Sequence, residues 1–405
     1  MFLPMYLSSR ARCAWTLSVH EAPPNPLYSG RIPCSMAGMT MAPSSLPQAT
    51  IRTTPEDFVV DEIPAYPASG KGEHLFVTLR KTGRTTLDVA RELARAFSVD
   101  QRGIGYAGMK DRHAITTQTI SLPVPMAVDV EPILSQLQLP GVEILEAKRH
   151  DNKLKPGHLD GNRFKIRLRC GSAENAEVIR AKLVETAQQG APNFFGPQRF
   201  GRDGTNPTRA LAWLAGKERG PKDRHEQRLL FSALQSMLFN QVLDKRIADG
   251  TWTTVLPGDL AKKHDSGGLF LVPNDGPDLD DARARAAALA ISATGPMFGV
   301  KMRWPEGAVK DLEMEVLTAV VPDLKRLDDF RAHGEGTRRS LRMEVTEFEG
   351  ADPDASGMLV VSFVLPKGGY ATTVLATACR LVDAMSRAGH AGDEEVGSEN
   401  TDQTS

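Results

Sequence analysis

One acidic residue is placed where it could do chemistry, in the loop GYAGMKDRH that covers residues 105–113. The two glycines of this loop allow the backbone to turn sharply or to approach a ligand closely. Asp111 stands between Lys110 and Arg112, and these cations favour the ionised carboxylate and would attract a phosphate. Such a carboxylate can act as a nucleophile, as a base, or only as the cap of a turn, and the loop by itself leaves all three open.

Two further segments contain residue types that could contact a nucleic acid. Residues 150–164 combine cations with a Gly/Asn turn, where Asn162 could hydrogen-bond a base edge and Phe164 could stack on a base. The alternative is a basic hairpin with Phe164 in the core. Residues 193–206 interleave aromatic residues with Arg, Gln and Gly, which suits either an RNA surface or a tight loop between domains.

The net charge of −1 does not indicate a polyanionic partner, but the distribution of charge along the chain does. Residues 148–169 contain eight Lys or Arg against two Asp, a local charge of +6, and residues 199–228 contain eight against four acidic residues, or +4. Local basic patches bind nucleic acid whatever the total charge. Each stretch could equally be a solvated face, and charge alone does not decide between the two interpretations.

The composition disfavours several other classes of site. The four cysteines, Cys13, Cys34, Cys170 and Cys379, form no CxxC pair, and the nine histidines lack the spacing of metal ligands. We therefore expect no metal site, no disulfide framework and no cofactor, in a protein of the reducing cytoplasm. No stretch approaches the roughly 20 apolar residues that span a bilayer, so no membrane partner is expected.

The elements that must position the candidate residues follow from hydrophobic patterning, which is that of an α/β chain without a regular repeat. Alternating or continuous apolar runs predict strands at 58–63, 75–79, 116–122, 164–168 and 359–365. Apolar residues at helical spacing predict helices at 86–97, 227–247, 281–291 and about 372–386. Both ends of the chain lack a core pattern and are expected to be disordered.

Taken together, these segments resemble the TruD family of tRNA pseudouridine synthases. The similarity spans about residues 52–380 and rests on six motifs in family order, namely PEDF at 55–58 and the segments 105–118, 153–164, 193–206, 232–241 (SALQSMLFNQ) and 365–373 (LPKGGYATT). The resemblance implies an α+β protein with the pseudouridine-synthase fold, a mixed, mainly antiparallel sheet with flanking helices. A TruD-type α/β insertion domain is expected to interrupt this fold.

The resemblance also implies a domain organisation. We expect a catalytic domain assembled from residues 48–189 and 346–388, with the insertion domain at 190–345 between its two parts. Residues 1–47 are expected to form a disordered leader and residues 389–405 a disordered acidic tail.

The activity implied is the isomerisation of a uridine in tRNA, most specifically uridine 13, to pseudouridine by a monomer that needs no cofactor or metal. The family nucleophile falls on Asp111. The positions expected to contact the substrate base are Phe58, Asn162, Phe164 and Tyr370. The candidates for contact with the RNA backbone are Lys110, Arg112, Lys153, Lys155 and Arg163.

The sequence departs from the family pattern at two of these places. The family often has Lys where this chain has Arg52, and Phe where it has Tyr370. A tyrosine can still stack on a base, but Arg does not replace Lys freely at a site of tight geometry, which leaves the contact of Arg52 open.

Two alternatives remain beside this interpretation. A non-catalytic RNA-binding protein on the same fold would keep the basic patches and have no use for Asp111. A hydrolase using Asp111 with a histidine would require a second positioned acid or base, and none stands out in the motifs.

Overall fold

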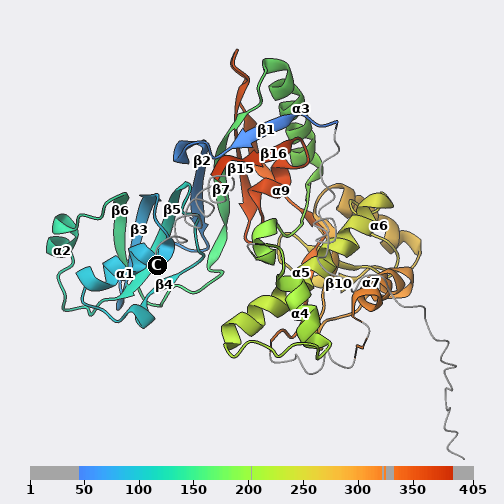
Figure 1. Cartoon of the computed structure of the whole chain (residues 1–405), viewed down its shortest axis with the longest axis horizontal. Coiled ribbons are helices and arrows are strands. Elements are labelled where there is room, and N and C mark those ends of the chain that lie inside the picture. Colours follow the sequence, from blue (N-terminus) through green and yellow to red (C-terminus); the bar gives the residue numbers. More distant parts are fainter. Residues whose placement is uncertain (1–44, 202, 322, 325–332, 386–405) are drawn as a thin grey trace, which may run out of the picture.

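The structure is a computed structural model that describes residues 45–201, 203–321, 323–324 and 333–385 (Figure 1). The leader expected at 1–47 and the tail expected at 389–405 therefore lie outside the described residues, apart from residues 45–47.

A ten-stranded mixed sheet organises the part of the chain that holds most of the candidate residues. Its main path is β14-β15-β7-β2-β5-β3-β6; β1 pairs with β16 and β7, and β4 pairs with β5. All pairs are antiparallel except β1 with β16 and β2 with β5. The strands are β1 (Gln48–Ile51), β2 (Phe58–Pro64), β3 (His74–Thr82), β4 (Gly105–Tyr106), β5 (Ile115–Pro123), β6 (Val142–His150), β7 (Leu159–Arg169), β14 (Thr346–Gly350), β15 (Met358–Pro366) and β16 (Arg380–Asp383).

Helices cover this sheet in two places. At one end, α1 (Thr86–Ala96) and α2 (Glu131–Gln136) pack with β3, β5 and β6 around one core cluster. At the other end, α3 (Ala173–Gln189) and α9 (Ala371–Leu375) pack with β7 and β15 around a second cluster, and α3 also contacts the edge strand β14. Figure 1 shows the two groups side by side, with α3 uppermost. Short 3-10 turns at Pro55–Asp57 and Gln101–Gly103 complete this part.

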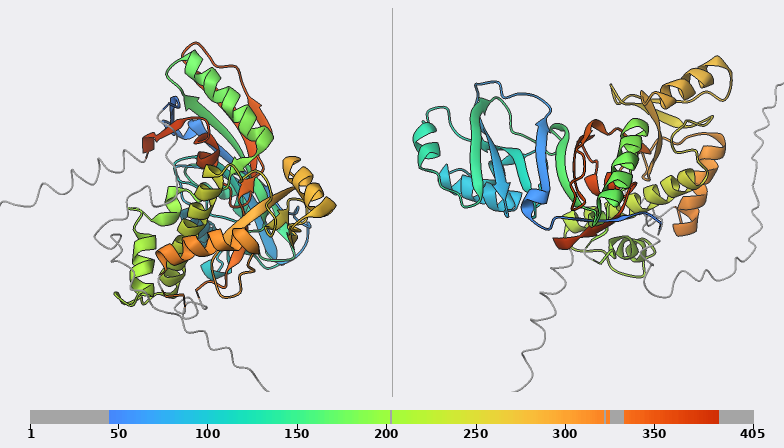
Figure 2. Two further views of the ribbon diagram at one scale, coloured as in Figure 1. Left: turned by 90° about the vertical axis from the view of Figure 1, so that its right-hand side faces the viewer. Right: turned by 90° about the horizontal axis from the view of Figure 1, so that it is seen from above.

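A second body contains a separate four-stranded sheet of order β10-β9-β11-β12. Its core forms around α5 (Arg224–Ala248) and the fully buried strand β11 (Ile291–Met297). Figure 2 shows α6 (Gly276–Ala287) and α7 (Gly307–Val320) far from the end that carries α1 and α2. A two-stranded pair, β8 with β13, stands apart from this sheet. The elements are β8 (Ala191–Pro192), a 3-10 turn (Pro197–Phe200), α4 (Asn206–Leu214), α5 (Arg224–Ala248), β9 (Leu260–Lys263), β10 (Leu269–Leu271), α6 (Gly276–Ala287), β11 (Ile291–Met297), α7 (Gly307–Val320), β12 (Thr337–Ser340) and β13 (Arg342–Met343).

Strand alternation decides which side chains β7 directs to the core. Phe164, Ile166 and Leu168 are buried, while the cations between them, at 163, 165, 167 and 169, are exposed. Successive side chains of a strand point to opposite faces, so the two sets cannot share a surface. One face of β7 therefore lies toward α3 and α9, and the other carries positive charge.

The fold expected from the sequence is confirmed, with a mixed and mainly antiparallel sheet flanked by helices. The five predicted strands appear as β2, β3, β5, β7 and β15, and the predicted helices at 86–97 and 227–247 appear as α1 and α5. Helix α1 begins after Thr85, whose hydroxyl accepts a hydrogen bond from the backbone N–H of Asp88, as expected of an N-terminal cap.

Two helix predictions are wrong in part. The helix expected at 281–291 ends at Ala287, because Leu289 adopts a left-handed conformation (φ 59°) and Ile291 begins the buried strand β11. The helix expected at about 372–386 ends at Leu375, and β16 follows, paired in parallel with β1. Residues 380–383 find backbone partners in β1, a long-range pairing that local periodicity does not reveal.

None of the helices in the described part of the chain is long and apolar enough to cross a membrane.

A buried ion pair joins the end of α5 to the segment just before β9 in the second body. The guanidinium of Arg246 donates to both carboxylate oxygens of Asp259, at 3.0 and 3.1 Å, and both side chains are at most 2% exposed. The same carboxylate accepts the backbone N–H of Leu256 at 2.7 Å. Removing the arginine would leave a buried carboxylate without its counter-charge, which is a strongly destabilising change.

We expect Arg246→Met to lower the free energy of unfolding by about 3–5 kcal/mol, the range for breaking a buried ion pair. The neighbouring Lys245→Met is the matched control, because the ion pair of Lys245 with Glu315 is exposed; its loss should cost no more than about 1 kcal/mol. Denaturant unfolding followed by tryptophan fluorescence measures both, since Trp252 packs against this core. Equal losses in the two variants would contradict the assignment of the buried pair.

Candidate active site

A cavity of about 480 Å³ collects residues from widely separated parts of the chain. It is bordered by β2, β5, β7, the loop at 105–113 and the start of α9. All five residues expected at the reacting base, Asp111, Phe58, Asn162, Phe164 and Tyr370, line it. The other lining residues are Arg52, Val60, Met109, Lys110, Thr116, Gln198, Ala371 and Thr372.

A buried lysine, Lys81, fixes the loop that carries Asp111. The ammonium of Lys81 donates to the backbone oxygens of Arg84 (2.7 Å), Asp111 (2.9 Å) and Lys110 (3.4 Å). Burial lowers the pKa of Lys81 to about 8, an effect that the nearby Asp111 partly offsets. Because these three carbonyls belong to two loops, Lys81 ties the position of Asp111 to the end of β3.

The start of the same loop requires a glycine. A Cβ atom on Gly105 would lie 2.0 Å from the backbone oxygen of Leu154, far inside van der Waals contact. The segment after Leu154 stays close, since the backbone N–H of Gly157 donates to the oxygen of Ala107 at 2.8 Å. The loop at 105–113 therefore packs directly against the basic turn at 153–158.

Arg52 is the direct partner of Asp111. One terminal nitrogen lies 2.9 Å from Asp111 Oδ2, the other lies 2.7 Å from Asp383 Oδ2, and the guanidinium lies 4.2 Å from the ring centre of Phe58. The Asp111 side chain is 35% exposed, so its carboxylate remains accessible from the cavity. The sequence left open whether Arg52 makes a contact at the site, and in the structure its guanidinium contacts the Asp111 carboxylate.

The backbone of Arg52 is itself unusual. Its φ of 56° lies in the left-handed region, which costs a non-glycine residue roughly 1–2 kcal/mol. The residue follows β1 directly, and this turn directs the side chain toward the Phe58 ring and the cavity. The surrounding ion pairs offset the local strain.

Aromatic rings form two walls of the cavity. Phe58 and Phe164 meet edge to face with ring centres 6.1 Å apart, and Phe164 also packs on Phe363 at 5.6 Å. Tyr370, at the start of α9, lines the cavity together with Gln198 from the second body. A planar ligand would therefore meet ring faces and edges in a largely apolar space.

The cavity also contains a buried polar group. Lys110 Nζ lies 2.9 Å from Glu62 Oε2 and donates to Asn162 Oδ1 at 2.5 Å. The side chains of Lys110 and Glu62 are only 7% and 3% exposed. Because its Oδ1 is taken by the ammonium, Asn162 would face a ligand mainly through its amide N–H groups.

The expectation that Lys110 contacts the RNA backbone stays a prediction. Its ammonium is neutralised by Glu62 inside the cavity and does not lie on the outer surface. The expectation for Arg163 also stays a prediction: Arg163 lies on the face of β7 opposite to Asn162 and Phe164, where it is half-exposed and pairs with Glu347 at 2.6 Å.

The remaining backbone candidates stay near the loop. Arg112 is exposed and donates to the oxygen of Gly83 at 3.3 Å. Lys153 donates to the oxygen of Arg102 at 2.8 Å, and Lys155 is exposed on the turn that packs against Ala107. Arg112, Lys153 and Lys155 therefore lie on or next to the loop at 105–113, and their contacts with RNA stay predictions.

Four residues of the site were not identified from the sequence, namely Lys81, Glu62, Gln198 and Asp383. Glu62 lies inside the predicted strand at 58–63, where a charged residue in a half-buried run is the one signal that could have identified it. Lys81 lies beyond the predicted strand at 75–79, because β3 is longer than predicted and ends at Thr82. Asp383 was assigned to a helix, which concealed its position beside Arg52.

Within the described residues, no group of three or more His, Cys, Asp or Glu side chains could hold a metal ion. Cys170 and Cys379 are buried free thiols, and burial raises the pKa of Cys170 to about 11 and of Cys379 to about 12. Such thiols are poor nucleophiles near neutral pH.

Comparison with known proteins agrees with the geometry. The family model described as tRNA pseudouridine synthase D (TruD) matches residues 41–211 and 223–377. The tRNA pseudouridine synthase D of Anaeromyxobacter sp. strain Fw109-5 is 43% identical over 334 residues, 80% of this chain and 91% of the relative. That of a Thermus thermophilus strain is 44% identical over 328 residues, 80% of this chain and 87% of the relative.

A solved structure shows the same fold. The structure of the putative tRNA pseudouridine synthase D (TruD) from Methanosarcina mazei superposes with a TM-score of 0.68 at 24% identity, covering 87% of this chain and 98% of its own. The family match, which covers most of the sequence, and the identity to the bacterial relatives show that this chain belongs to the TruD family of tRNA pseudouridine synthases, which are isomerases.

Proposed function

We propose that this chain converts a uridine of tRNA, with uridine 13 as the specific target, into pseudouridine, and that Asp111 is the group that acts on the ribose. The observation that carries the proposal is the cavity itself. An accessible carboxylate, held by Arg52, opens into a space walled by Phe58, Phe164 and Tyr370 and edged by the amide of Asn162.

The reaction needs little beyond these groups. The bond between N1 of the base and C1′ of the ribose breaks, the base turns, and C5 forms a new bond to C1′. The proton that leaves C5 is balanced by the one that N1 gains, so no co-reactant is consumed. An ionised Asp111 can attack C1′ or remove a proton from the neighbouring C2′, and either route starts the cleavage.

The detached base must stay in place while it turns. The aromatic walls can hold it by stacking, which contributes roughly 1–3 kcal/mol per base. The amide of Asn162 can hydrogen-bond its edge. The nucleotide must first leave its stack, because the ribose and base cannot reach Asp111 within a helix.

The two alternative functions are less well supported by this geometry. A hydrolase would require a second acid or base beside Asp111, but no histidine among the described residues lines the cavity, and the Glu62 carboxylate is paired with Lys110. A non-catalytic RNA-binding protein would not need the shared arginine or the strained backbone at Arg52 that hold the Asp111 carboxylate.

The domain organisation belongs to the same proposal. Residues 48–189 and 346–388 would form the catalytic domain and residues 190–345 the insertion domain. Strand pairing supports this division, since β1–β7 and β14–β16 form one sheet and β9–β12 another. We also propose that the protein acts as a monomer.

We expect Asp111→Asn to reduce turnover by at least about 10²–10⁴-fold, the range associated with a lost acid–base group. Binding of tRNA should change little, since the amide keeps the size of the side chain. Pseudouridine formation on bulk tRNA, mapped by position, measures activity and the target uridine together. Pseudouridine formed at the wild-type rate by the variant would remove Asp111 from the mechanism.

Arg52 can be tested by two graded substitutions. Arg52→Lys keeps the charge but cannot bridge Asp111 and Asp383 together, so we expect kcat to fall about 10-fold, as when a hydrogen bond to a charged group is removed. The kcat of Arg52→Met should fall further, because this side chain has no charge to hold the Asp111 carboxylate. Arg80→Lys is the control, since that exposed arginine pairs with Glu143 at 3.8 Å on the surface. Full activity of Arg52→Met would show that the bridge has no role in the reaction.

Removal of metal ions should leave the reaction itself intact. The test uses tRNA that is folded beforehand and then mixed with enzyme and chelator, which separates RNA folding from chemistry. Complete loss of pseudouridine formation, restored by added divalent ions, would contradict a mechanism that runs on protein side chains alone.

A further inference from the structure

The cavity that Asp111 lines receives one side chain from the second body. Among the described residues that border it, Gln198 alone belongs to that body. Gln198 lies in the 3-10 turn Pro197–Phe200, and its side chain is exposed. The chemistry described above makes no use of it, although it lies in the same space as the carboxylate of Asp111 and the rings of Phe58 and Tyr370.

The turn that carries Gln198 is fixed to helix α5. The neighbouring guanidinium of Arg199 donates to two serine hydroxyls of that helix, and Phe200 is 2% exposed in the core of the second body. On the other side of the turn, the backbone N–H and oxygen of Phe195 both bond to the side-chain amide of Asn240, at 2.9 and 3.1 Å. The backbone of Gln198 therefore has a defined position, while its side chain is free to meet a ligand.

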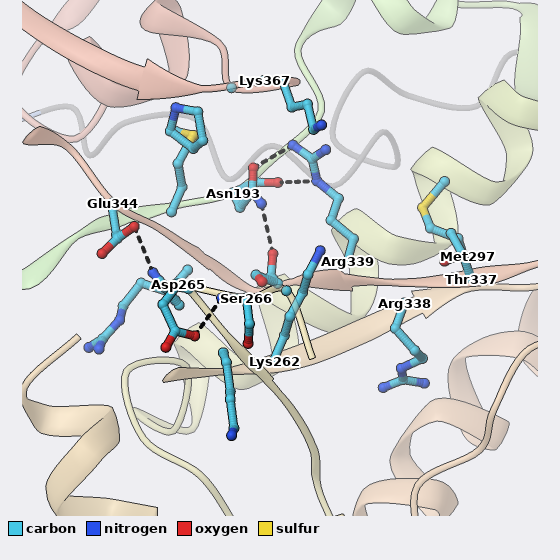
Figure 3. Close-up of a pocket in the computed structure, with 18 of the residues that line it drawn as sticks. Asn193, Lys262, Asp265, Ser266, Met297, Thr337, Arg338, Arg339, Glu344 and Lys367 are labelled. Atoms are coloured by element: carbon cyan, nitrogen blue, oxygen red, sulfur yellow. Dashed lines mark hydrogen bonds and ion pairs between the residues drawn. The ribbon is translucent and has the colours of Figure 1, made fainter. Parts of the chain in front are cut away.

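An arginine of β12, Arg339, ties the same segment to the turn that precedes Tyr370. Its guanidinium donates to the backbone oxygen of Asn193 at 3.2 Å and to that of Gly368 at 3.0 Å. Figure 3 shows Arg339 directed at Asn193, in the wall of a second cavity of about 660 Å³. The segments that carry Gln198 and Tyr370 therefore share one anchor, which holds the two side chains in register with each other.

A glycine gives the Gln198 amide its place beside the Tyr370 ring. A Cβ atom on Gly196 would lie 2.8 Å from Oε1 of Gln198 and 3.5 Å from the ring of Tyr370. The amide and the ring therefore border the same small space above the Gly196 backbone. A planar base stacked on the ring would have its edge toward the amide.

Most charged groups of the cavity already have partners. Arg52 is shared by two carboxylates, and Lys110 is held by Glu62 and by Oδ1 of Asn162. The amide of Gln198, in contrast, forms no hydrogen bond with the described residues. A primary amide carries two N–H donors and one acceptor oxygen. The amides of Asn162 and Gln198 therefore both remain able to donate to a ligand, and both are neutral.

The reaction places negative charge on the base. When the bond between N1 and C1′ breaks, its electron pair leaves with the base, whether Asp111 has attacked C1′ or has removed the proton from C2′. The detached uracil is then an anion, and its charge is shared by N1 and the carbonyl oxygens at C2 and C4. The charge is lost when C5 gives an electron pair to C1′. A donor already aimed at one of those oxygens lowers the barrier to cleavage.

We propose that Gln198 contacts the target base, donating an amide N–H to a carbonyl oxygen of the detached uracil and stabilising its negative charge. The inference rests on the proposed function. Turning uracil about its N3–C6 axis exchanges N1 with C5 and the C2 carbonyl with the C4 carbonyl. A donor that is fixed in the cavity therefore faces a carbonyl oxygen both before and after the turn. A neutral donor suits this place, because a cation would form a second ion pair with Asp111.

Two substitutions of different character test this role in the full-length chain, with pseudouridine formation measured over a range of tRNA concentrations. Gln198→Met keeps the length of the side chain but removes the N–H groups, so kcat should fall about 10–100-fold, the range for a lost hydrogen bond to a charged group. Gln198→Glu keeps the shape but replaces the donor by a carboxylate that repels the anion, so its kcat should fall further. KM should change much less in both variants, because the interaction strengthens only as charge develops.

The matched controls are Gln188→Met and Gln188→Glu, because this exposed glutamine of α3 lies outside the lining of the cavity. Both should keep the wild-type kcat, and thermal unfolding should show that all four variants are folded. A Gln198→Glu variant as active as the wild type would overturn the inference, since the side chain would then only fill space or accept a hydrogen bond. A loss confined to KM would overturn it as well. A wild-type protein without activity on tRNA would instead contradict the proposed function, so the two failures are distinct.

Discussion

The site depends on one shared guanidinium. Arg52 contacts Asp111 from the loop at 105–113 and Asp383 from β16, a residue 331 positions away along the chain. This is possible because β1 and β16 pair in parallel and bring the two ends of the described chain together. A carboxylate without a partner in this position would be free to rotate, and one fully enclosed by cations would be unreactive. Sharing Arg52 with a second acid orients Asp111 while leaving it exposed to the cavity.

The other charged groups near Asp111 are also held by defined partners. Lys110 and Glu62 are nearly buried and neutralise each other, and Lys81 gives its hydrogen bonds to backbone carbonyls. Buried charges of this kind contribute little net stability, because desolvation offsets their attraction. They do restrict geometry, since each group has few alternative partners in a space of low dielectric constant. The polar contacts of Lys81, Lys110 and Glu62 therefore fix the loop that carries Asp111, and the rings of Phe58 and Phe164 form the side walls of the cavity.

Strand alternation on β7 places its cations on one face of the sheet. On β7, one face carries Asn162 and Phe164 toward the cavity that Asp111 lines, and the other carries the row of cations from Arg163 to Arg169. Half of a stretch that reads as one basic segment therefore lies on the far side of the sheet.

The sequence by itself predicted five strands, helix α1, the long helix α5 and, through the family resemblance, the five residues that meet around the cavity lined by Asp111. Those features are local, or are carried by motifs in which the key side chain has a fixed place. Only the tertiary structure decided that Lys110 faces Glu62, that Arg163 faces away, that residues 380–383 form a strand and that Arg52 serves two carboxylates. Each of these depends on register and on long-range pairing, because a side chain's partner is set by the strand that lies beside it and not by its neighbours in the chain.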